Sequence, residues 1–392
     1  MRWSRPIAPI NPCFAAPREP RSVIAADTAT LRIDCTALAA NWQRLDAENR
    51  QTTPHAATGA AVKANAYGIG VDIAAPALLA AGCRHFFTAT LDEAVALRAL
   101  LPNIWIAVLN GIPRGAAREF LAHRLHPVLN TLPDLADWQA VAAQPNAPGA
   151  LLHLDTGMAR LGLDADDIAA LIANPGQLGA IKLDYLMSHF AAAEIHDAPS
   201  NSAQSSLFAT LSAQITQSCG QTPKTSLANS AALFLGPLAA SDLARPGYAL
   251  YGGNPTPAAP NPMRPVLHLA APVLQIREIP RGASVGYNAT WSAPRRTRVA
   301  TIAIGYADGI LRAASNRLTA RHGGATIQQI GRVSMDLLTF DVTDHPAIER
   351  GSRLTLLDEV QTIETLAEQA NTSGYEILTS LGPRYRRVVE PL

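Results

Sequence analysis

The stretch Ala61-Val62-Lys63-Ala64-Asn65-Ala66-Tyr67-Gly68-Ile69-Gly70 places a lysine at the end of a short apolar run and follows it with a loop that contains glycine. In a β/α barrel, the carboxyl ends of the strands carry the active site. A lysine in that position, among small and apolar neighbours, would have a lowered pKa and could attack an aldehyde. Taken alone, the commoner situation is a strand-end lysine that extends its ammonium group into solvent.

Short apolar runs alternate with Ala/Leu-rich stretches of helical period from residue 31 to about residue 252. The expected strands are 60–62, 85–88, 104–109, 151–154 and 183–187. The expected helices are 73–81, 92–101, 134–143, 165–173 and 203–217. This order predicts a parallel sheet, and the span is close to the ~250 residues of a (β/α)8 barrel. We therefore expect an α/β fold with an N-terminal TIM-type barrel rather than an open doubly wound sheet.

A proline-rich segment at 255–262 separates this region from a part with a different rhythm. Short strand-like runs follow at 266–276, 298–304, 325–330, 337–342 and 354–357, with one helix expected at 363–370. The sequence thus predicts a loose N-terminal extension (1–26), a barrel (27–254) and a mainly β C-terminal domain (255–392). The extension has several arginines but no apolar core or cleavage signal, which leaves an organelle transit peptide as the weaker alternative.

Composition restricts the partners of the chain. Of its 392 residues 48% are hydrophobic and 16% are charged, and the net charge of +1 creates no field that would gather nucleic acid. No apolar run reaches the ~20 residues that span a bilayer. The four cysteines, Cys13, Cys35, Cys83 and Cys219, are far apart and fit no metal-ligand spacing. We expect reduced thiols, no metal site, no membrane partner and a cytoplasmic location.

Two later segments could bind an anion: 229–232 (Asn-Ser-Ala-Ala) and 245–252 (Arg-Pro-Gly-Tyr-Ala-Leu-Tyr-Gly). Ser230 is a suitable N-cap, and amides at a helix start or beside Gly247 would point at a phosphate. Both segments follow the last expected barrel strands, where such barrels often bind phosphate. Each taken alone could equally be an ordinary cap and turn.

Two more side chains follow predicted strands. Arg160 can hold a carboxylate or phenolate through two hydrogen bonds, although a surface salt bridge to Asp155 or Asp164 is the simpler alternative. His189 also ends a strand, where a hydrogen-bonded structural histidine is the default interpretation.

Taken together, these segments resemble the alanine racemases, enzymes that use pyridoxal 5'-phosphate (PLP) and combine a barrel with a β-domain. The resemblance runs from about residue 31 to the C-terminus. Its motifs, in the family's order, are 61–68, 155–160, 189–190, 229–232, 245–247, 285–291, 304–309, 331–336 and 374–376.

The resemblance implies a role for each matching position. Lys63 would bind PLP covalently, and the phosphate would be held by Tyr67, Ser230, Gly247, Tyr248 and Tyr375. Arg245 would face the pyridine nitrogen, with His189 between it and Tyr287. Arg160 would contact both the phenolic oxygen of PLP and the substrate carboxylate. The Met335 amide would also contact that carboxylate, Asp336 would help to shape the site, and Tyr306 would line the entrance.

The resemblance also implies a mechanism with two bases. Lys63 would serve one face of the reacting carbon, and Tyr287 from the partner's β-domain would serve the other, so that the configuration inverts. The working unit would be a homodimer with shared active sites. The expected activity is the interconversion of L-alanine and D-alanine, either to supply D-alanine for peptidoglycan or to serve alanine breakdown.

The sequence departs from the family pattern at His153, where many relatives have a carbamylated lysine that braces the arginine matching Arg160. Histidine cannot form that stable carbamate, so we expect no carbamylated lysine here. A bound anion, another side chain or His153 itself must then support Arg160. Ile69 and Ser334 replace a histidine and a cysteine that are common in relatives, and neither is a proposed base.

Three other functions are compatible with some of these residues. A broad-specificity amino-acid racemase on the same scaffold is the nearest, since such relatives also lack the lysine. A PLP-binding homeostasis protein has no β-domain, so the motifs at 285–291 and 331–336 count against it. A related PLP decarboxylase would need different C-terminal site residues.

Overall fold

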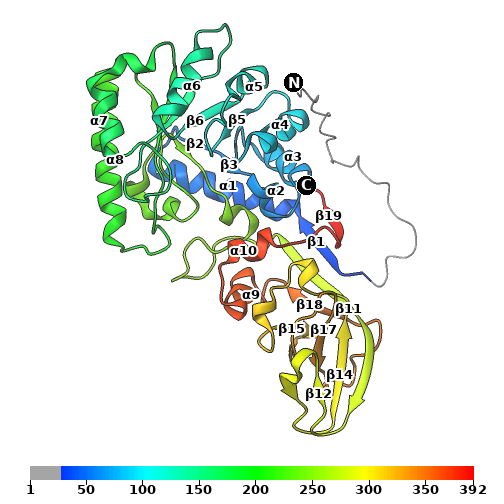
Figure 1. Cartoon of the computed structure of the whole chain (residues 1–392). Helices are drawn as coiled ribbons and strands as arrows, with labels where there is room; N and C mark the ends of the chain where they lie inside the picture. The colour runs from blue at the N-terminus through cyan, green and yellow to red at the C-terminus, as the bar shows by residue number, and fades with distance from the viewer. Residues whose placement is uncertain (1–27) are drawn as a thin grey trace, which may run out of the picture.

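The computed structural model describes residues 28–392, so the predicted extension (1–26) lies outside the described residues. The described chain forms a ring of strands wrapped in helices and, beside it, a mainly β part (Figure 1). No helix in residues 28–392 combines the length and the apolar character needed to cross a membrane.

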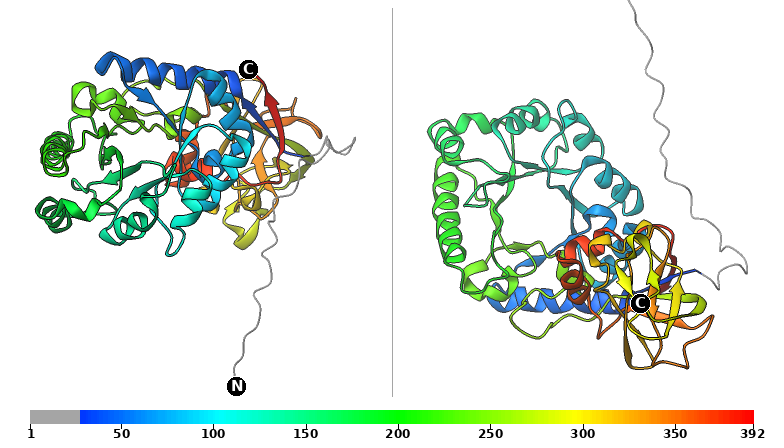
Figure 2. Two further views of the ribbon diagram at one scale, coloured as in Figure 1. Left: turned by 90° about the horizontal axis from the view of Figure 1, so that it is seen from above. Right: turned by 60° about the horizontal axis from the view of Figure 1, so that its bottom comes forward.

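The ring is a parallel β/α barrel, as the sequence predicts. Its strands are β2 (Ala57–Thr58) and β3 (Ala60–Ala61), β4 (His85–Thr88), β5 (Trp105–Val108), β6 (His126–Leu129), β7 (Ala150–His153), β8 (Leu183–Met187), β9 (Lys224–Ser226) and β10 (Leu243–Ala244). The sheet runs in order from β3 to β9, and β10 pairs in parallel with β2, which precedes β3 across Gly59. The right view of Figure 2 looks into this ring and shows the helices outside it.

Within the described chain, seven helices surround the barrel, and side chains cap the start of four of them. They are α1 (Cys35–Thr52), α3 (Val71–Ala81), α4 (Leu91–Leu100), α5 (Ala117–Ala122), α6 (Leu132–Ala142), α7 (Ala165–Ala173) and α8 (Pro199–Cys219). Thr90 and Glu93 form a reciprocal capping box at α4, and Thr131 with Asp134 does the same at α6. Each expected barrel helix is present, with ends shifted by a few residues at most.

The sequence analysis missed α1. Buried Asn41 and Asn49 interrupt its apolar face and so hide its helical period. Asn41 donates to the Leu250 and Arg264 carbonyls, at 3.1 and 2.9 Å, which compensates for burying its amide.

Aromatic side chains close the amino-terminal end of the barrel. Trp105 at the start of β5 stacks on His126 at the start of β6, with ring centroids 4.4 Å apart, and meets Tyr185 edge-on at 5.9 Å. His126 Nδ1 lies 2.8 Å from the Gly149 carbonyl oxygen. The opposite, carboxyl end of the barrel is left for a site.

The C-terminal part is mainly β, as predicted. Its strands are β11 (Leu267–Ile279), β12 (Ser284–Val285), β13 (Trp291–Ser292), β14 (Thr297–Ile302), β15 (Thr319–His322), β16 (Ala325–Gln328), β17 (Leu338–Asp341), β18 (Arg353–Leu357) and β19 (Arg386–Glu390). Helix α9 (Ile363–Ala370) has the predicted bounds, and α10 (Gly374–Thr379) follows it.

One strand of this sheet comes from the start of the described chain. β1 (Thr30–Asp34), which the sequence analysis grouped with the barrel, pairs antiparallel with β11 and parallel with β19. Arg32 and Glu390 form an ion pair of 2.9 Å across β1 and β19. The two ends of the described chain therefore lie side by side.

Candidate active site

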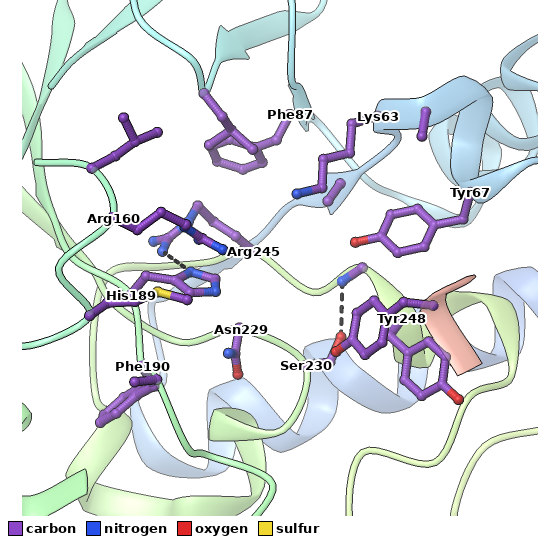
Figure 3. A pocket seen from close by; sticks show the side chains of 18 of the residues that line it. Lys63, Tyr67, Phe87, Arg160, His189, Phe190, Asn229, Ser230, Arg245 and Tyr248 are labelled. Atoms are coloured by element: carbon purple, nitrogen blue, oxygen red, sulfur yellow. Dashed lines mark hydrogen bonds between the residues drawn. The ribbon is translucent and has the colours of Figure 1, made fainter. Parts of the chain in front are cut away.

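A cavity of 850 Å³ opens at the carboxyl ends of the barrel strands. Lys63 follows β3, His153 ends β7, and Arg245 follows β10, so the fold itself brings these side chains to one rim. The predicted residues that line the cavity are Lys63, Tyr67, Arg160, His189, Ser230, Arg245, Gly247, Tyr248 and Tyr375. Figure 3 shows most of them around the central space.

Lys63 begins α2 (Lys63–Tyr67), which is a turn of left-handed backbone rather than a regular helix. Residues 64–67 have φ between 52° and 54°, although none of them is glycine. Such a conformation costs roughly 1–2 kcal/mol per residue, so surrounding contacts must enforce it. Glu93 accepts from the Ala64 amide at 2.7 Å, and the Asn65 side chain accepts from the Val71 amide at 2.9 Å. The turn fixes where the Lys63 side chain leaves the strand.

The Lys63 amine is less basic than an ordinary lysine, which confirms that expectation from the sequence. Burial is the main cause of its lowered pKa, and the positive charges of Arg160 and Arg245 lower the pKa further. Glu93 acts in the opposite direction. A larger fraction of uncharged amine makes Lys63 a better nucleophile for a carbonyl group.

Ser230 organises two backbone amides on the other side of the cavity. Its Oγ accepts from Gly247 N at 2.9 Å and from Ala249 N at 3.2 Å. The expectation that Ser230 caps a helix is wrong: Asn229 accepts from Ala232 N at 2.9 Å instead, at the start of η3 (Ala232–Ala239). Ser230 is turned toward η4 (Tyr248–Tyr251), where the first N–H groups have no partner within the turn.

Gly247 allows a tyrosine to approach this turn closely. A Cβ on Gly247 would lie 2.2 Å from the Tyr67 hydroxyl, so no other residue fits without a shift. Tyr67 stacks on Tyr251 with centroids 4.7 Å apart, and burial raises the pKa of Tyr67 to about 12. The Tyr67 hydroxyl therefore keeps its proton and can donate to an anion beside Gly247.

Tyr248 offers its backbone rather than its side chain. Its hydroxyl donates to Glu364 at 2.8 Å, and its ring stacks on Tyr375 of α10 with centroids 4.2 Å apart. Burial is the main cause that raises the pKa of Tyr375, whose hydroxyl lies 3.4 Å from Glu194. Because the Tyr248 hydroxyl is engaged, the backbone N–H of Tyr248 is the group that can donate to an anion.

Arg245 is a buried cation with fixed partners. It donates to Ser226 Oγ at 2.5 Å and to the Ser188 carbonyl at 2.6 Å, and its Nη2 lies 3.5 Å from His189 Nδ1 (Figure 3). Burial lowers the pKa of Arg245 to about 10, so it stays charged at neutral pH. Since a guanidinium only donates, His189 Nδ1 is the acceptor and the imidazole proton lies on Nε2. Burial and then Arg245 lower the pKa of His189 well below its usual range, so this imidazole is neutral.

Arg160 follows a loop that Asp155 holds in place. Asp155 Oδ1 accepts from the amides of residues 157, 158 and 159 at 2.9, 2.9 and 3.2 Å. Asp164 instead caps α7 through the amides of Asp166 and Asp167. The alternative of a salt bridge to Asp155 or Asp164 is therefore wrong, and within residues 28–392 the Arg160 guanidinium has no hydrogen-bond or ion-pair partner.

Four predicted site residues lie outside this cavity, all on the C-terminal part. Tyr287 begins η5 (Tyr287–Ala289) and is 65% exposed, Met335 is 53% exposed, and Tyr306 begins η6 (Tyr306–Asp308) and is 42% exposed. Asp336 accepts from Arg384 at 2.7 Å. A single chain does not bring these residues to its own Lys63.

Sequence reasoning also missed residues that support the cavity. Glu93 could have been found from its position in the capping box. Gln204 gave no signal: it lies buried on α8, accepts from Ala191 N at 2.9 Å and donates to the His189 carbonyl at 2.9 Å.

The fold and site thus define a β/α-barrel enzyme in which a nucleophilic lysine faces an anion-binding turn across one cavity. Family models agree with this class: the alanine racemase N-terminal domain matches residues 33–255, and the alanine racemase C-terminal domain matches residues 266–389. The chain belongs to the alanine racemase family.

Individual relatives are similar over nearly the whole chain. Alanine racemase of Acidiphilium cryptum is 56% identical over 92% of this chain and 98% of its own length. A catabolic alanine racemase of Agrobacterium fabrum is 42% identical over 91% of each chain. The crystal structure of Bartonella henselae alanine racemase with covalently bound pyridoxal phosphate has a TM-score of 0.87 at 40% identity, covering 93% of this chain and 99% of that one.

Proposed function

We propose that the protein is a PLP-dependent alanine racemase that interconverts L-alanine and D-alanine. The observation that carries the proposal is that the Lys63 amine, with its lowered pKa, shares one cavity with the turn around Ser230 and Gly247. An aldehyde bearing a phosphate fits both features. The relative from Bartonella henselae, which has pyridoxal phosphate covalently bound, supports the same assignment.

The residues of the cavity fit the aldehyde, the pyridine nitrogen and the phosphate of PLP. Lys63 would bind the aldehyde, and Arg245 would donate to the pyridine nitrogen. The phosphate would be held by Tyr67, Ser230, Gly247, the Tyr248 N–H and Tyr375. When bound, PLP delocalises the negative charge that remains when the substrate's Cα–H bond breaks. A permanently charged Arg245 leaves the pyridine nitrogen without its own proton, which restrains side reactions such as transamination.

We assign the two proton-transferring groups to different subunits. Lys63 would move a proton on one face of the substrate carbon, and Tyr287 of the partner subunit would move one on the opposite face. A free tyrosine has a pKa of about 10, so ionisation at neutral pH needs roughly 3–4 kcal/mol of stabilisation. The Nε2–H of His189, backed by the charge of Arg245, is suited to stabilise that phenolate.

The exposed side chains of the C-terminal part support a homodimer with shared sites. Tyr287, Tyr306, Met335 and Leu337 are large apolar side chains that this chain leaves 39–65% exposed. In the proposed dimer these residues would enter the partner's cavity, with Met335 and Asp336 near the substrate and Tyr306 at the entrance.

Mixed dimers test this assignment directly. Lys63→Ala and Tyr287→Phe chains are co-expressed with different tags, and the dimers that carry both tags are assayed for racemisation with PLP present. Each parent homodimer should be inactive, whereas the mixed dimer has one complete site and should recover about half of wild-type activity. A mixed dimer as inactive as its parents would disprove sharing of the site. Full racemisation of both enantiomers by Tyr287→Phe alone would disprove the two-base assignment.

The range of substrates and the physiological role of the enzyme need separate tests. A chiral assay of alanine against serine, lysine and arginine separates the alanine enzyme from a broad-specificity racemase. The alanine racemase of Agrobacterium fabrum is named catabolic, and a structural relative from Pseudomonas aeruginosa is named biosynthetic. We propose that this enzyme works in the cytoplasm. We also propose that its two domains meet between residues 254 and 255, with β1 added to the sheet of the C-terminal β-domain.

A further inference from the structure

His153 ends β7 in the wall of the cavity, where it is only 7% exposed. Its Nδ1 lies 2.7 Å from the side-chain oxygen of Asn130. The ring lies close to Gly162, where an added Cβ would be 3.2 Å from His153 Cδ2. His153 is thus a buried imidazole with one nitrogen already engaged.

The hydrogen bonds of Asn130 determine the tautomer of His153. Asn130 Nδ2 donates to the Leu109 carbonyl at 3.0 Å, so the amide nitrogen faces the backbone and Oδ1 faces the imidazole. The amide oxygen can only accept, so His153 Nδ1 must carry the proton. Nε2 then has a lone pair and no proton.

The electrostatic surroundings keep this imidazole neutral. Burial is the main cause that lowers the pKa of His153 to about 4, and Arg245 and Arg160 lower it further while Asp155 opposes them. Among residues 28–392 no group donates a hydrogen bond to Nε2. Because His153 lines the cavity, this unused acceptor is available to a donor there.

The Arg160 guanidinium, which has no hydrogen-bond partner among the described residues, can supply this donor. It lines the same cavity and is close enough for its charge to act on His153. Arg245 already donates to Ser226 and Ser188 and contacts His189, as described above. Lys63 is occupied by the cofactor in the proposed enzyme.

We propose that His153 is a positioning residue whose neutral Nε2 accepts a hydrogen bond from Arg160 and so orients that guanidinium toward the substrate carboxylate. This inference rests on the proposed function. A neutral acceptor has a specific advantage over a carboxylate: it fixes the direction of the guanidinium without cancelling its charge. The full positive charge of Arg160 then remains available to the substrate.

The tautomer is tested without any activity measurement. In the holoenzyme labelled with 15N-histidine, nitrogen–proton correlation spectra at pH 7 distinguish the two neutral tautomers and the imidazolium, and His153→Gln identifies the signal. We expect the neutral Nδ1–H form. A neutral Nε2–H form or an imidazolium would overturn the proposal, even if the enzyme racemises alanine as proposed.

Kinetics test the action on Arg160. His153→Leu removes the acceptor and should raise the KM for alanine about tenfold with a smaller change in kcat, because the guanidinium loses the hydrogen bond that orients it toward the substrate. His153→Gln offers an amide oxygen and should recover part of this loss. An unchanged KM in His153→Leu, or a Gln variant no better than the Leu variant, would overturn the proposal.

Two further variants separate this role from general loss of structure. Asn130→Asp gives Nδ1–H a charged acceptor, which favours the imidazolium; Nε2 then becomes a donor facing Arg160, and KM should rise as in His153→Leu.

The control is His85→Leu. His85 is a half-buried histidine at the start of β4, and burial also lowers its pKa to about 4. KM should stay at the wild-type value in this control, and an equal rise in both would overturn the proposal. If wild-type holoenzyme fails to racemise alanine, the proposed function is wrong, and the spectra alone decide the tautomer.

Discussion

Arg384 donates two hydrogen bonds to Asp308, both 2.7 Å long, and its third nitrogen donates to Asp336, also at 2.7 Å. Asp308 also accepts from Gly305 N at 2.8 Å. The two segments that Arg384 joins are bonded directly as well, because Tyr306 N donates to the Ser334 carbonyl at 2.9 Å. One side chain therefore sets the spacing between the loops that carry Tyr306 and Met335.

Arg384→Gln should weaken substrate binding more than it weakens the fold. Both loops are proposed to enter the partner's cavity, so we expect KM for alanine to rise about tenfold. Arg384 is about half exposed, and its removal should lower the free energy of unfolding by no more than about 1 kcal/mol. Asp336→Asn, which weakens one of the three bonds, is the control and should show a smaller rise in KM. Equal KM values for wild type and Arg384→Gln would disprove this role.

Lys63 should react with carbonyl compounds at a lower pH than the exposed Lys182. Borohydride reduction of the holoenzyme followed by peptide mass analysis should place the cofactor on Lys63. In the apoprotein, the folded pKa of Lys63 lies below that of an unfolded lysine, so the unfolded chain binds more protons between the two values. Stability should therefore rise with pH across that window, and Lys63→Met should flatten the rise. A label on Lys182 instead would contradict the site assignment.

Gly247→Ala should impair cofactor binding. The new Cβ would overlap the Tyr67 hydroxyl at 2.2 Å, which forces either the tyrosine or the η4 turn away from the phosphate position. We expect the affinity for PLP, measured by absorbance titration of the apoprotein, to fall at least about tenfold. Gly176→Ala is a suitable control, because its Cβ would meet only the Asn174 side chain at 3.3 Å and it lies on η2 (Pro175–Leu178), remote from the cavity. Unchanged affinity in Gly247→Ala would contradict the proposed phosphate site.

Glu364→Ala should loosen the contact between the barrel and the C-terminal part. Glu364 on α9 accepts from the Tyr248 hydroxyl at 2.8 Å and from Asn254 N at 2.7 Å. Loss of both bonds should reduce the free energy of unfolding by about 2–3 kcal/mol, measured by urea denaturation. Glu368→Ala changes an exposed glutamate of the same helix and should have almost no effect. Equal stability of the two variants would show that Glu364 does not stabilise this contact.

The sequence was sufficient for elements whose pattern is local. The strands 85–88 and 183–187 and the helices 165–173 and 363–370 have the predicted bounds, because apolar runs or helical periods between clear caps and turns specify them. The parallel barrel followed from their order. Lys63, Arg160 and His189 meet in one cavity because each follows a strand of that barrel.

Features that depend on distant contacts could not be read from the sequence. Nothing in Ala64-Asn65-Ala66-Tyr67 indicates left-handed backbone, since Glu93 and the rest of the fold impose it. The Ser230 hydroxyl accepts hydrogen bonds from the amides of Gly247 and Ala249 at η4 instead of capping the helix that follows it. The strand before Arg245 brings η4 within reach of this hydroxyl. The helical period of α1 is hidden by two asparagines whose partners lie elsewhere in the chain.

The position of β1 has a consequence for synthesis on the ribosome. This strand is among the first described residues to be made, yet it lies between β11 and β19, and β19 is the last strand of the described chain. Until β19 is made, one edge of β1 has no neighbour to pair with. The nascent chain must therefore keep the apolar face of this strand from wrong associations during that time, and loss of β19 would leave that edge open for good.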